Sequence, residues 1–214
     1  MKFEVVSTNL EFEFCRGKRR NGLVRIISGK AAGFILKTPK GLDVRPTPDL
    51  HRQAIFNTLR DLVVDAELLE LFAGIGSLTL ECLSRGSKSA TCIEKSHKHG
   101  RIIQDNWKKA KLTDSPLDVH IKDAYLGAKQ LAEAGRTFDL ILADPPYGPK
   151  NVNTRSTSLA QKALDDENIP KLLKPEAIFL LGHTKRDTLD LPPIYEERKF
   201  MKHGDTCFRF LTLA

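Results

Sequence analysis

The chain has 214 residues, of which 41% are hydrophobic and 29% charged, values that are ordinary for a folded globular protein and exclude a disordered or fibrous chain. No apolar run approaches the length that crosses a membrane, and glutamates stand where a signal peptide needs an apolar core, so we expect a cytoplasmic protein. The four cysteines lack the spacing of a zinc site, which predicts reduced thiols and no metal.

The net charge of +7 is concentrated in one early stretch. Residues 15–45 contain nine basic residues and one acid, a balance of +8, so the rest of the chain sums to −1. A localised basic patch on a nearly neutral body suggests a polyanion partner, most simply nucleic acid, although a solvated basic face explains the same charge run. The candidate contacts to a nucleic acid are Arg16, Lys18, Arg19, Arg20, Arg25, Lys30 and Lys37.

The sequence pattern of residues 1–46 predicts a small β module. Residues 10–14 alternate apolar and polar side chains, as a half-buried strand does. The apolar runs 23–28 and 33–38 flank a glycine-containing link, a pattern typical of a hairpin. We therefore expect a basic N-terminal β appendage.

A helix start separates this appendage from the second predicted domain, residues 47–214. Thr47 suits an N-cap, Pro48 suits the first helical position and Asp49 favours the positive helix end. The apolar residues behind them recur with helical spacing, which predicts a helix over 48–63.

From residue 67 onward, short apolar runs alternate with segments of helical character. The runs that suit buried strands are 67–72, 89–94, 117–121, 138–143 and 177–182. The segments with helical character are 77–85, 96–110, 124–135 and 156–170. Strands separated by helices imply βαβ units and a parallel sheet, and the last two runs, 195–200 and 206–213, predict an antiparallel hairpin.

The first of these strands ends in a glycine-rich turn. Gly74 and Gly76 allow the backbone to turn sharply and a ligand to approach closely, but a plain tight turn explains them equally well. Ligands in such sheets bind beyond the carboxyl ends of the strands. The turn departs from the dinucleotide-binding fingerprint because Thr79 stands in the place of the third glycine.

Two acids follow the next strands. Glu94 lies about 20 residues past the glycines, where an acid accepts hydrogen bonds from ribose hydroxyls, although an ordinary exposed acid remains an equal alternative. The spacing fits a nicotinamide dinucleotide and an adenosyl ligand alike. Asp123 can accept a hydrogen bond from an adenine amino group, but a lone aspartate in such a turn is more typical of a helix N-cap. His97 and His99 lack a convincing metal-ligand spacing, and we expect both at the surface.

The most specific motif is Asp144-Pro145-Pro146-Tyr147, which follows a strongly apolar strand. Two prolines restrict the backbone and remove two amide donors, so the Asp144 carboxylate and the Pro145 carbonyl can converge as acceptors on one point. Such a pair can hold the hydrogens of an exocyclic amine on a nucleobase and expose its lone pair, while Tyr147 offers a flat face for the base. A proline-rich turn after a buried strand is the plainer alternative.

Together these motifs resemble the class I S-adenosylmethionine-dependent methyltransferases that act on amino groups. A closer resemblance, to the RsmD family of 16S rRNA (guanine-N2)-methyltransferases, covers nearly the whole chain from Arg25. It is carried by RIISGKAAGFILKTPKGLDVRPTPDLHRQAIFNTL, LELFAGIGSLTLECLSRG, LADPPYG and KFMKHGDTCFRF. The chain departs from the family pattern at Leu50 and Gln53, where arginine and glutamate are usual.

The resemblance implies an α/β fold: a Rossmann-like class I methyltransferase with a mostly parallel sheet, an antiparallel C-terminal hairpin and a small N-terminal β module. It implies methyl transfer from S-adenosylmethionine to the N2 amine of a guanine in 16S ribosomal RNA, with S-adenosylhomocysteine as product and no metal. The expected partner is ribosomal RNA within a small-subunit particle, and the expected protein is a monomer with no membrane contact.

The resemblance also assigns candidate site residues. The catalytic candidates are Asp144, Pro145, Pro146 and Tyr147. The cofactor-binding candidates are Glu70, Phe72, Ala73, Gly74, Gly76, Glu94, Lys95, Asp123, Ala124, Arg45 and Thr47.

Three alternatives remain at this point. The first is an amino methyltransferase that acts on DNA adenine or protein glutamine, although a DNA enzyme usually needs a larger recognition region and the glutamine type usually has asparagine before the prolines. The second is a nonenzymatic RNA-binding ribosome assembly factor. The third is a nicotinamide oxidoreductase, which the motif at Asp144 and the residue Thr79 both disfavour.

Overall fold

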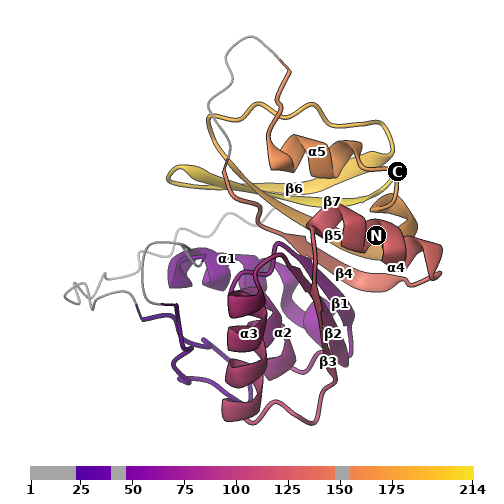
Figure 1. Cartoon of the computed structure of the whole chain (residues 1–214). Helices are drawn as coiled ribbons and strands as arrows, with labels where there is room; N and C mark the ends of the chain where they lie inside the picture. The colour runs from indigo at the N-terminus through magenta and orange to yellow at the C-terminus, as the bar shows by residue number, and fades with distance from the viewer. Residues whose placement is uncertain (1–22, 40–46, 148–154) are drawn as a thin grey trace.

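A seven-stranded sheet runs through the computed structural model, which describes residues 23–39, 47–147 and 155–214 (Figure 1). The strand order is β3-β2-β1-β4-β5-β7-β6. The first five strands are mutually parallel, and β7 pairs antiparallel with both β5 and β6. The strands are β1 (Glu67–Leu71), β2 (Ser89–Glu94), β3 (Leu117–Ile121), β4 (Phe138–Ala143), β5 (Leu173–Thr184), β6 (Tyr195–His203) and β7 (Thr206–Leu213).

Helices connect the parallel strands, as the alternation of runs predicts. The helices are α1 (Asp49–Leu59), η1 (Arg60–Val63), α2 (Ser77–Ser84), α3 (His97–Lys109), α4 (Ala124–Glu133), α5 (Leu159–Asp165) and η2 (Pro170–Leu172). The predicted class is confirmed: the sheet is mostly parallel and its C-terminal hairpin is antiparallel.

Two predicted helices are shorter than their sequence patterns indicate. The segment 48–63 divides into α1 and a 3-10 turn, because Arg60 has a φ of 45° that no α-helix accommodates. The segment 156–170 contains helix only from Leu159 to Asp165, because Asp166 is already extended and its carboxylate accepts the backbone N–H groups of the following residues.

The expected N-cap at Thr47 is wrong. Pro48 occupies the N-cap position of α1, and no side chain caps the helix there. The Thr47 hydroxyl instead donates to Oδ2 of Asp144 at 2.8 Å, a contact between residues 97 positions apart in the chain.

The two faces of the sheet bury separate apolar clusters. On one face α1, α2 and α3 pack against the strands, and on the other α4 and α5 do so (Figure 1). Adjacent residues of β1 illustrate the division, since Leu68 belongs to the first cluster and Leu69 to the second. Burial on both faces explains why the strands read as continuous apolar runs.

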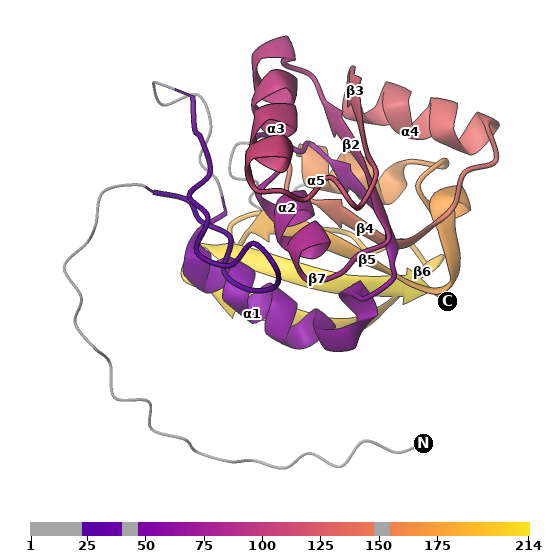
Figure 2. The same cartoon turned by 90° about the horizontal axis from the view of Figure 1, so that it is seen from below.

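Residues 23–39 turn back on themselves and join the core on the α1 side. The N–H of Ile26 donates to the carbonyl of Phe34 at 2.9 Å, and an isolated antiparallel bridge joins Arg25 to Ile35. Val24, Ile26 and Leu36 pack into the same cluster as α1 and α2, and Figure 2 shows this segment beside α1.

Two buried charges fasten this segment. Glu81 of α2 is fully buried and accepts the backbone N–H groups of Ile27 at 2.6 Å and Ser28 at 3.0 Å. Arg52 of α1 is also fully buried and donates to the carbonyl of Arg25. The predicted strand 10–14 and the candidates Arg16, Lys18, Arg19, Arg20 and Arg45 lie outside the described residues.

Within the described ranges, no helix combines the length and apolar character that a membrane crossing requires.

Candidate functional site

The candidate site lies at the carboxyl ends of the central parallel strands. The strand order reverses between β1 and β4, because the chain leaves β1 toward β2 and β3 and then crosses back to β4. Such a reversal opens a crevice at the carboxyl edge of the sheet, where α/β proteins bind ligands. The glycine turn follows β1, Glu94 ends β2, Asp123 follows β3 and Asp144 follows β4.

The turn after β1 is tightly wound. Phe72, Gly74 and Gly76 all have positive φ values, of 58°, 55° and 71°. A left-handed conformation is uncommon for phenylalanine and marks a backbone that its surroundings hold in place. The N–H of Ala73 donates to the carbonyl of Ile93 at 3.1 Å, which ties the turn to the end of β2.

Gly76 has a packing reason beyond its φ. A β-carbon at Gly76 would approach the side chain of Ile103 on α3 to 3.0 Å, which is tighter than ordinary contact. The missing side chain therefore lets α3 pack closely against the start of α2.

Glu94 is buried and holds the edge of the site together. Its Oε2 accepts the N–H of Gly74 at 2.7 Å, and its Oε1 accepts the N–H of Ser96 at 2.8 Å. Nδ1 of His99 lies 3.3 Å from Oε1. A carboxylate offers about four acceptor positions, so Glu94 retains capacity for a ligand hydroxyl. The side chain of His99 is only 12% exposed, so its expected surface position is wrong, whereas His97 is exposed.

Asp123 is the N-cap of α4. Its Oδ1 accepts the N–H groups of Tyr125 at 3.0 Å and Leu126 at 3.3 Å, which is the structural alternative that the sequence left open. The next residue, Ala124, is buried, while Lys95 is exposed beside the end of β2.

Glu70 is a buried acid at the end of β1. The backbone N–H of Thr79 donates to its Oε2 at 3.0 Å, and the Thr79 hydroxyl donates to the same oxygen. Burial raises the pKa of Glu70 to about 8, and the two hydrogen bonds from Thr79 oppose that rise only in part. The side chain therefore carries a proton at neutral pH.

Replacement of Glu70 by glutamine is expected to remove a pH dependence of stability. The folded pKa of about 8 exceeds the ordinary value of 4.5, so between these pH values the folded chain holds a proton that the unfolded chain has released. Stability therefore falls as pH rises through this window, by an amount on the order of several kcal/mol. Thermal unfolding of Glu70→Gln should show a gain over wild type at pH 9 that vanishes near pH 4.

Glu67, at the other end of β1, provides the matched control. Lys88 and Lys174 donate to its carboxylate and lower its pKa to about 2, so the sign of the linkage is reversed. Glu67→Gln should lose stability above pH 4.5, and the loss should disappear as pH falls toward 2. Equal profiles for the two variants would contradict the assignment for Glu70.

The segment Asp144 to Tyr147 follows directly after β4. Asp144 is partly buried, Pro145 is buried and Tyr147 is 51% exposed. The Tyr147 hydroxyl lies 3.4 Å from Oδ1 of Asp144 and 3.2 Å from the Thr206 hydroxyl of β7. Burial raises the pKa of Asp144, and the hydrogen bonds from Thr47 and Tyr147 oppose that rise.

Sequence reasoning missed two neighbours of Asp144. Thr206 anchors the Tyr147 hydroxyl, and Gly182 of β5 lies directly against the Asp144 carboxylate. Gly182 sits inside an apolar strand run, where it resembles an ordinary core position, and Thr206 is one of several polar residues of a hairpin. The register of β5 with β4, which pairs Ala143 with Leu181, brings Gly182 to Asp144. The register of β5 with β7, which pairs Thr184 with Thr206, brings Thr206 to the same end of the sheet.

The described cations of the early basic stretch are each paired with an acid of the body. Arg25 lies 3.2 Å from Asp49, Lys30 lies 3.4 Å from Asp114, and Lys37 lies 3.1 Å from Asp105. These side chains are all exposed, so each pair stabilises the fold only slightly. The pairs nevertheless orient the segment on the surface.

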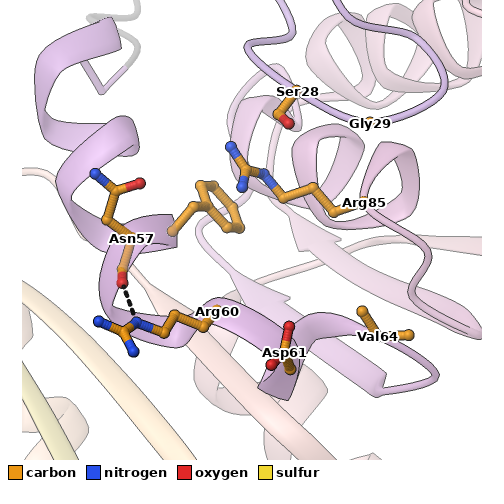
Figure 3. Close-up of a pocket in the computed structure, with 8 residues that line it drawn as sticks. Ser28, Gly29, Asn57, Arg60, Asp61, Val64 and Arg85 are labelled. Atoms are coloured by element: carbon orange, nitrogen blue, oxygen red, sulfur yellow. Dashed lines mark hydrogen bonds between the residues drawn. The ribbon is translucent and has the colours of Figure 1, made fainter.

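A separate surface cavity of about 680 Å³ lies away from this site (Figure 3). It is lined by Ser28, Gly29, Phe56, Asn57, Arg60, Asp61, Val64 and Arg85. Arg85 follows the C-terminus of α2, which points to the amino edge of the sheet, whereas the motifs lie at the carboxyl edge. Its guanidinium stacks on Phe56 at 4.6 Å and pairs with Glu81 at 2.8 Å. The cavity therefore does not coincide with the predicted site.

In the part of the chain that the structure describes, no group of three His, Cys, Asp or Glu side chains is arranged to hold a metal ion.

Comparisons with known proteins cover nearly all of the described chain. A family model described as conserved hypothetical protein 95 matches residues 24–212. The chain is 29% identical over 188 residues to the ribosomal RNA small subunit methyltransferase D of Haemophilus influenzae, covering 88% of this chain and 93% of the relative. It is 33% identical over 127 residues to the protein of the same name from Escherichia coli, covering 59% of this chain and 62% of the relative.

Solved structures agree with the observed topology. The E. coli protein yhhF superposes with a TM-score of 0.74 at 26% identity, covering 90% of this chain and 98% of that one. A 16S rRNA N2 G1207 methyltransferase from T. thermophilus, solved with AdoMet and guanosine, superposes with a TM-score of 0.59 at 19% identity. That likeness covers 82% of this chain and 45% of the other, and at this identity it shows the fold alone.

Proposed function

Since the chain belongs to the RsmD family, whose model is described as conserved hypothetical protein 95, we propose that it is an S-adenosylmethionine-dependent methyltransferase of small-subunit ribosomal RNA. The observation that carries this proposal is the Asp144–Tyr147 segment at the end of β4, beside the strand reversal and the glycine turn of β1. The relatives are named as methyltransferases, which disfavours a nonenzymatic assembly factor.

The residues at the carboxyl edge fit S-adenosylmethionine. We assign the ribose hydroxyls to Glu94, whose carboxylate retains acceptor capacity, and the adenine to the start of α4 near Asp123 and Ala124. The turn from Phe72 to Gly76 would contact the methionine part, with Glu70 shaping that end of the pocket. When bound, S-adenosylmethionine supplies a methyl group on a sulfonium that is already a good leaving group.

Asp144 and the Pro145 carbonyl are proposed to hold the target amine. As acceptors for its two hydrogens, they draw the nitrogen lone pair out of conjugation with the base. The exposed lone pair would accept the methyl group that bound S-adenosylmethionine supplies, with the carbon–sulfur bonding pair left on sulfur, and the Asp144 carboxylate would take up the surplus amine proton. The half-exposed Tyr147 ring offers a face on which the extruded base stacks.

The finer assignments belong to the same proposal. The acceptor is the exocyclic N2 of a guanine in 16S rRNA, and the substrate is a small-subunit particle in the cytoplasm, on which the protein acts as a monomer. The basic stretch 15–45 supplies the contacts to RNA phosphates.

Methyl transfer assays on matched substrates test this proposal. Labelled S-adenosylmethionine is supplied with small-subunit particles from a strain that lacks the protein, with their deproteinised 16S rRNA, with DNA and with peptides. Digestion of the RNA and mass spectrometry should identify N2-methylguanosine. Label in DNA or peptide alone, or no label in any substrate, would refute the proposed substrate.

Replacement of Glu94 by alanine is expected to weaken S-adenosylmethionine binding by about 1.5–3 kcal/mol, because a charged acceptor to ribose hydroxyls is lost. Calorimetry with the purified protein measures the change. Glu94→Gln is the informative companion, since it keeps one acceptor oxygen for the N–H of Gly74 or for the ribose. Unchanged affinity in both variants would mean that Glu94 only braces the turn.

A further inference from the structure

Two groups outside its own motif lie against the Asp144 carboxylate, namely Thr47 and Gly182, and a third, Thr206, holds the Tyr147 hydroxyl beside it. Thr47 precedes α1, Gly182 belongs to β5 and Thr206 begins β7. None of these three positions lies within 30 residues of Asp144 in the chain, so only the tertiary fold brings them to the carboxylate.

Thr47 restrains one oxygen. Its side chain is 7% exposed, and its hydroxyl donates to Oδ2 of Asp144 at 2.8 Å, a normal length for a hydroxyl–carboxylate hydrogen bond. The hydroxyl hydrogen is therefore committed to Asp144, while the second oxygen, Oδ1, lies on the side of Tyr147 and Gly182.

Gly182 provides the space for Oδ1. A β-carbon at this position would lie 3.0 Å from Cγ of Asp144, closer still to Oδ1, and 3.3 Å from Cε1 of Phe208. Contacts this close to the carboxylate would force it to move, and the same β-carbon would also press on Phe208 of the neighbouring strand. Only glycine lets the carboxylate lie flat against β5.

We propose that Thr47 and Gly182 are positioning residues for Asp144: the Thr47 hydroxyl orients Oδ2, and the bare backbone of Gly182 admits Oδ1. This inference rests on the proposed function, because the orientation matters only if Asp144 accepts a hydrogen from the target amine. Neither residue touches the reacting atoms. Both act through the direction in which the carboxylate points.

The inference assigns Thr47 to Asp144, where its hydroxyl donates, instead of to the cofactor as the resemblance implied. It therefore predicts a loss in turnover without a loss in cofactor affinity. Thr47→Val removes the hydroxyl at nearly constant volume and should lower kcat about 10-fold, as expected for one lost hydrogen bond to a charged group. Thr47→Ser keeps the hydroxyl and should restore most of the activity. Gly182→Ala should lower kcat about 10- to 100-fold, because small misplacements of a reacting group are costly.

The pH dependence of kcat/KM separates the proposed role from a general loss of structure, because a merely structural defect would not shift it. The Thr47 hydrogen bond lowers the pKa of Asp144 against the effect of burial, so Thr47→Val should raise that pKa and shift the acid limb of kcat/KM to higher pH. Among the residues that the structure describes, the other titratable groups that act on this carboxyl are Tyr147 in its own loop and Glu70 on β1. The facing residues of β5 and β7, Gly182 and Phe208, do not titrate.

Two controls separate positioning from loss of structure. Thr58→Val removes a hydroxyl from α1 that donates to the Ala54 carbonyl at 3.1 Å, away from Asp144, and should leave kcat unchanged. Gly182→Ala is also made together with Asp144→Ala. If Gly182 acts through Asp144, adding Gly182→Ala to Asp144→Ala should lower kcat no further than Asp144→Ala does alone.

The measurements are kcat and KM on ribosomal RNA particles, the dissociation constant for S-adenosylmethionine, the pH profile and thermal unfolding. Methyl transfer by the wild type comes first, since its absence refutes the proposed function. With an active wild type, the inference is overturned if Thr47→Val leaves kcat and the pH profile unchanged, if Thr47→Ser is as impaired as Thr47→Val, or if cofactor affinity falls as much as kcat. Should Gly182→Ala fail to fold, the two Thr47 variants decide the outcome.

Discussion

Replacement of Asp144 by alanine is expected to lower turnover by about 10²–10³-fold, the usual cost of losing one preorganised polar contact in an active site. The Pro145 carbonyl remains in that variant, so the amine keeps one of its two acceptors and some activity survives. The dissociation constant for S-adenosylmethionine should stay close to the wild-type value, because the ligands assigned to the cofactor lie on β1, β2 and β3.

Single-turnover assays on small-subunit particles measure this loss directly. Asp144→Asn keeps a carbonyl oxygen to accept from Thr47 or from the amine, so its turnover should fall between those of the wild type and the alanine variant. Asp61→Ala is the matched control, because Asp61 is exposed on η1 beside the separate cavity. Near-normal turnover of Asp144→Ala would reject the role assigned to the carboxylate.

The alternation of strands and helices was predictable because both faces of this sheet are buried. The central strands are therefore largely apolar runs, as in β4, and the helices between the runs have their own apolar spacing, as in α3. The ends of helices were less predictable. Thr47 has the chemistry of an N-cap, but a partner 97 residues away outcompetes the local backbone for its hydroxyl.

The parts of the candidate site that lie close together in the sequence could be predicted. The parts that only strand pairing brings together could not. Asp144 to Tyr147 are adjacent in the chain, so the motif alone was enough to propose a site at the end of β4. Gly182 reaches Asp144 only because β5 pairs with β4 in one particular register, and no spacing along the sequence encodes that contact. Asp123 carried two interpretations, and the sequence could not separate them because a cap and an adenine acceptor use the same carboxylate.

The basic stretch 15–45 leads to the second large expected effect. Its balance of +8 against −1 for the rest of the chain makes it the expected RNA footprint. Phosphate contacts release condensed counterions, so affinity for RNA should fall steeply with salt. If about six phosphates are neutralised, binding should weaken roughly 10³-fold between about 50 and 200 mM salt.

Alanine at Arg19, Arg20 and Lys37 together should weaken RNA binding and reduce the salt slope by about 2–3, in proportion to the contacts removed. Nζ of Lys37 lies 3.1 Å from Oδ2 of Asp105, and both side chains are exposed, so the loss of Lys37 costs little stability. The unpaired Asp105 carboxylate that remains should repel the RNA phosphates and weaken binding further. Removal of Lys129, Arg136 and Lys171 is the charge-matched control, since these residues lie on or beside α4 and η2, on the opposite face of the sheet. Anisotropy titrations at several salt concentrations compare the two triple variants with the wild type, and S-adenosylmethionine affinity should be unchanged in both.

Equal salt slopes for all three proteins would mean that the stretch is a solvated face. The RNA would then bind elsewhere, and Arg155 and Lys162 beyond Tyr147 are the next candidates.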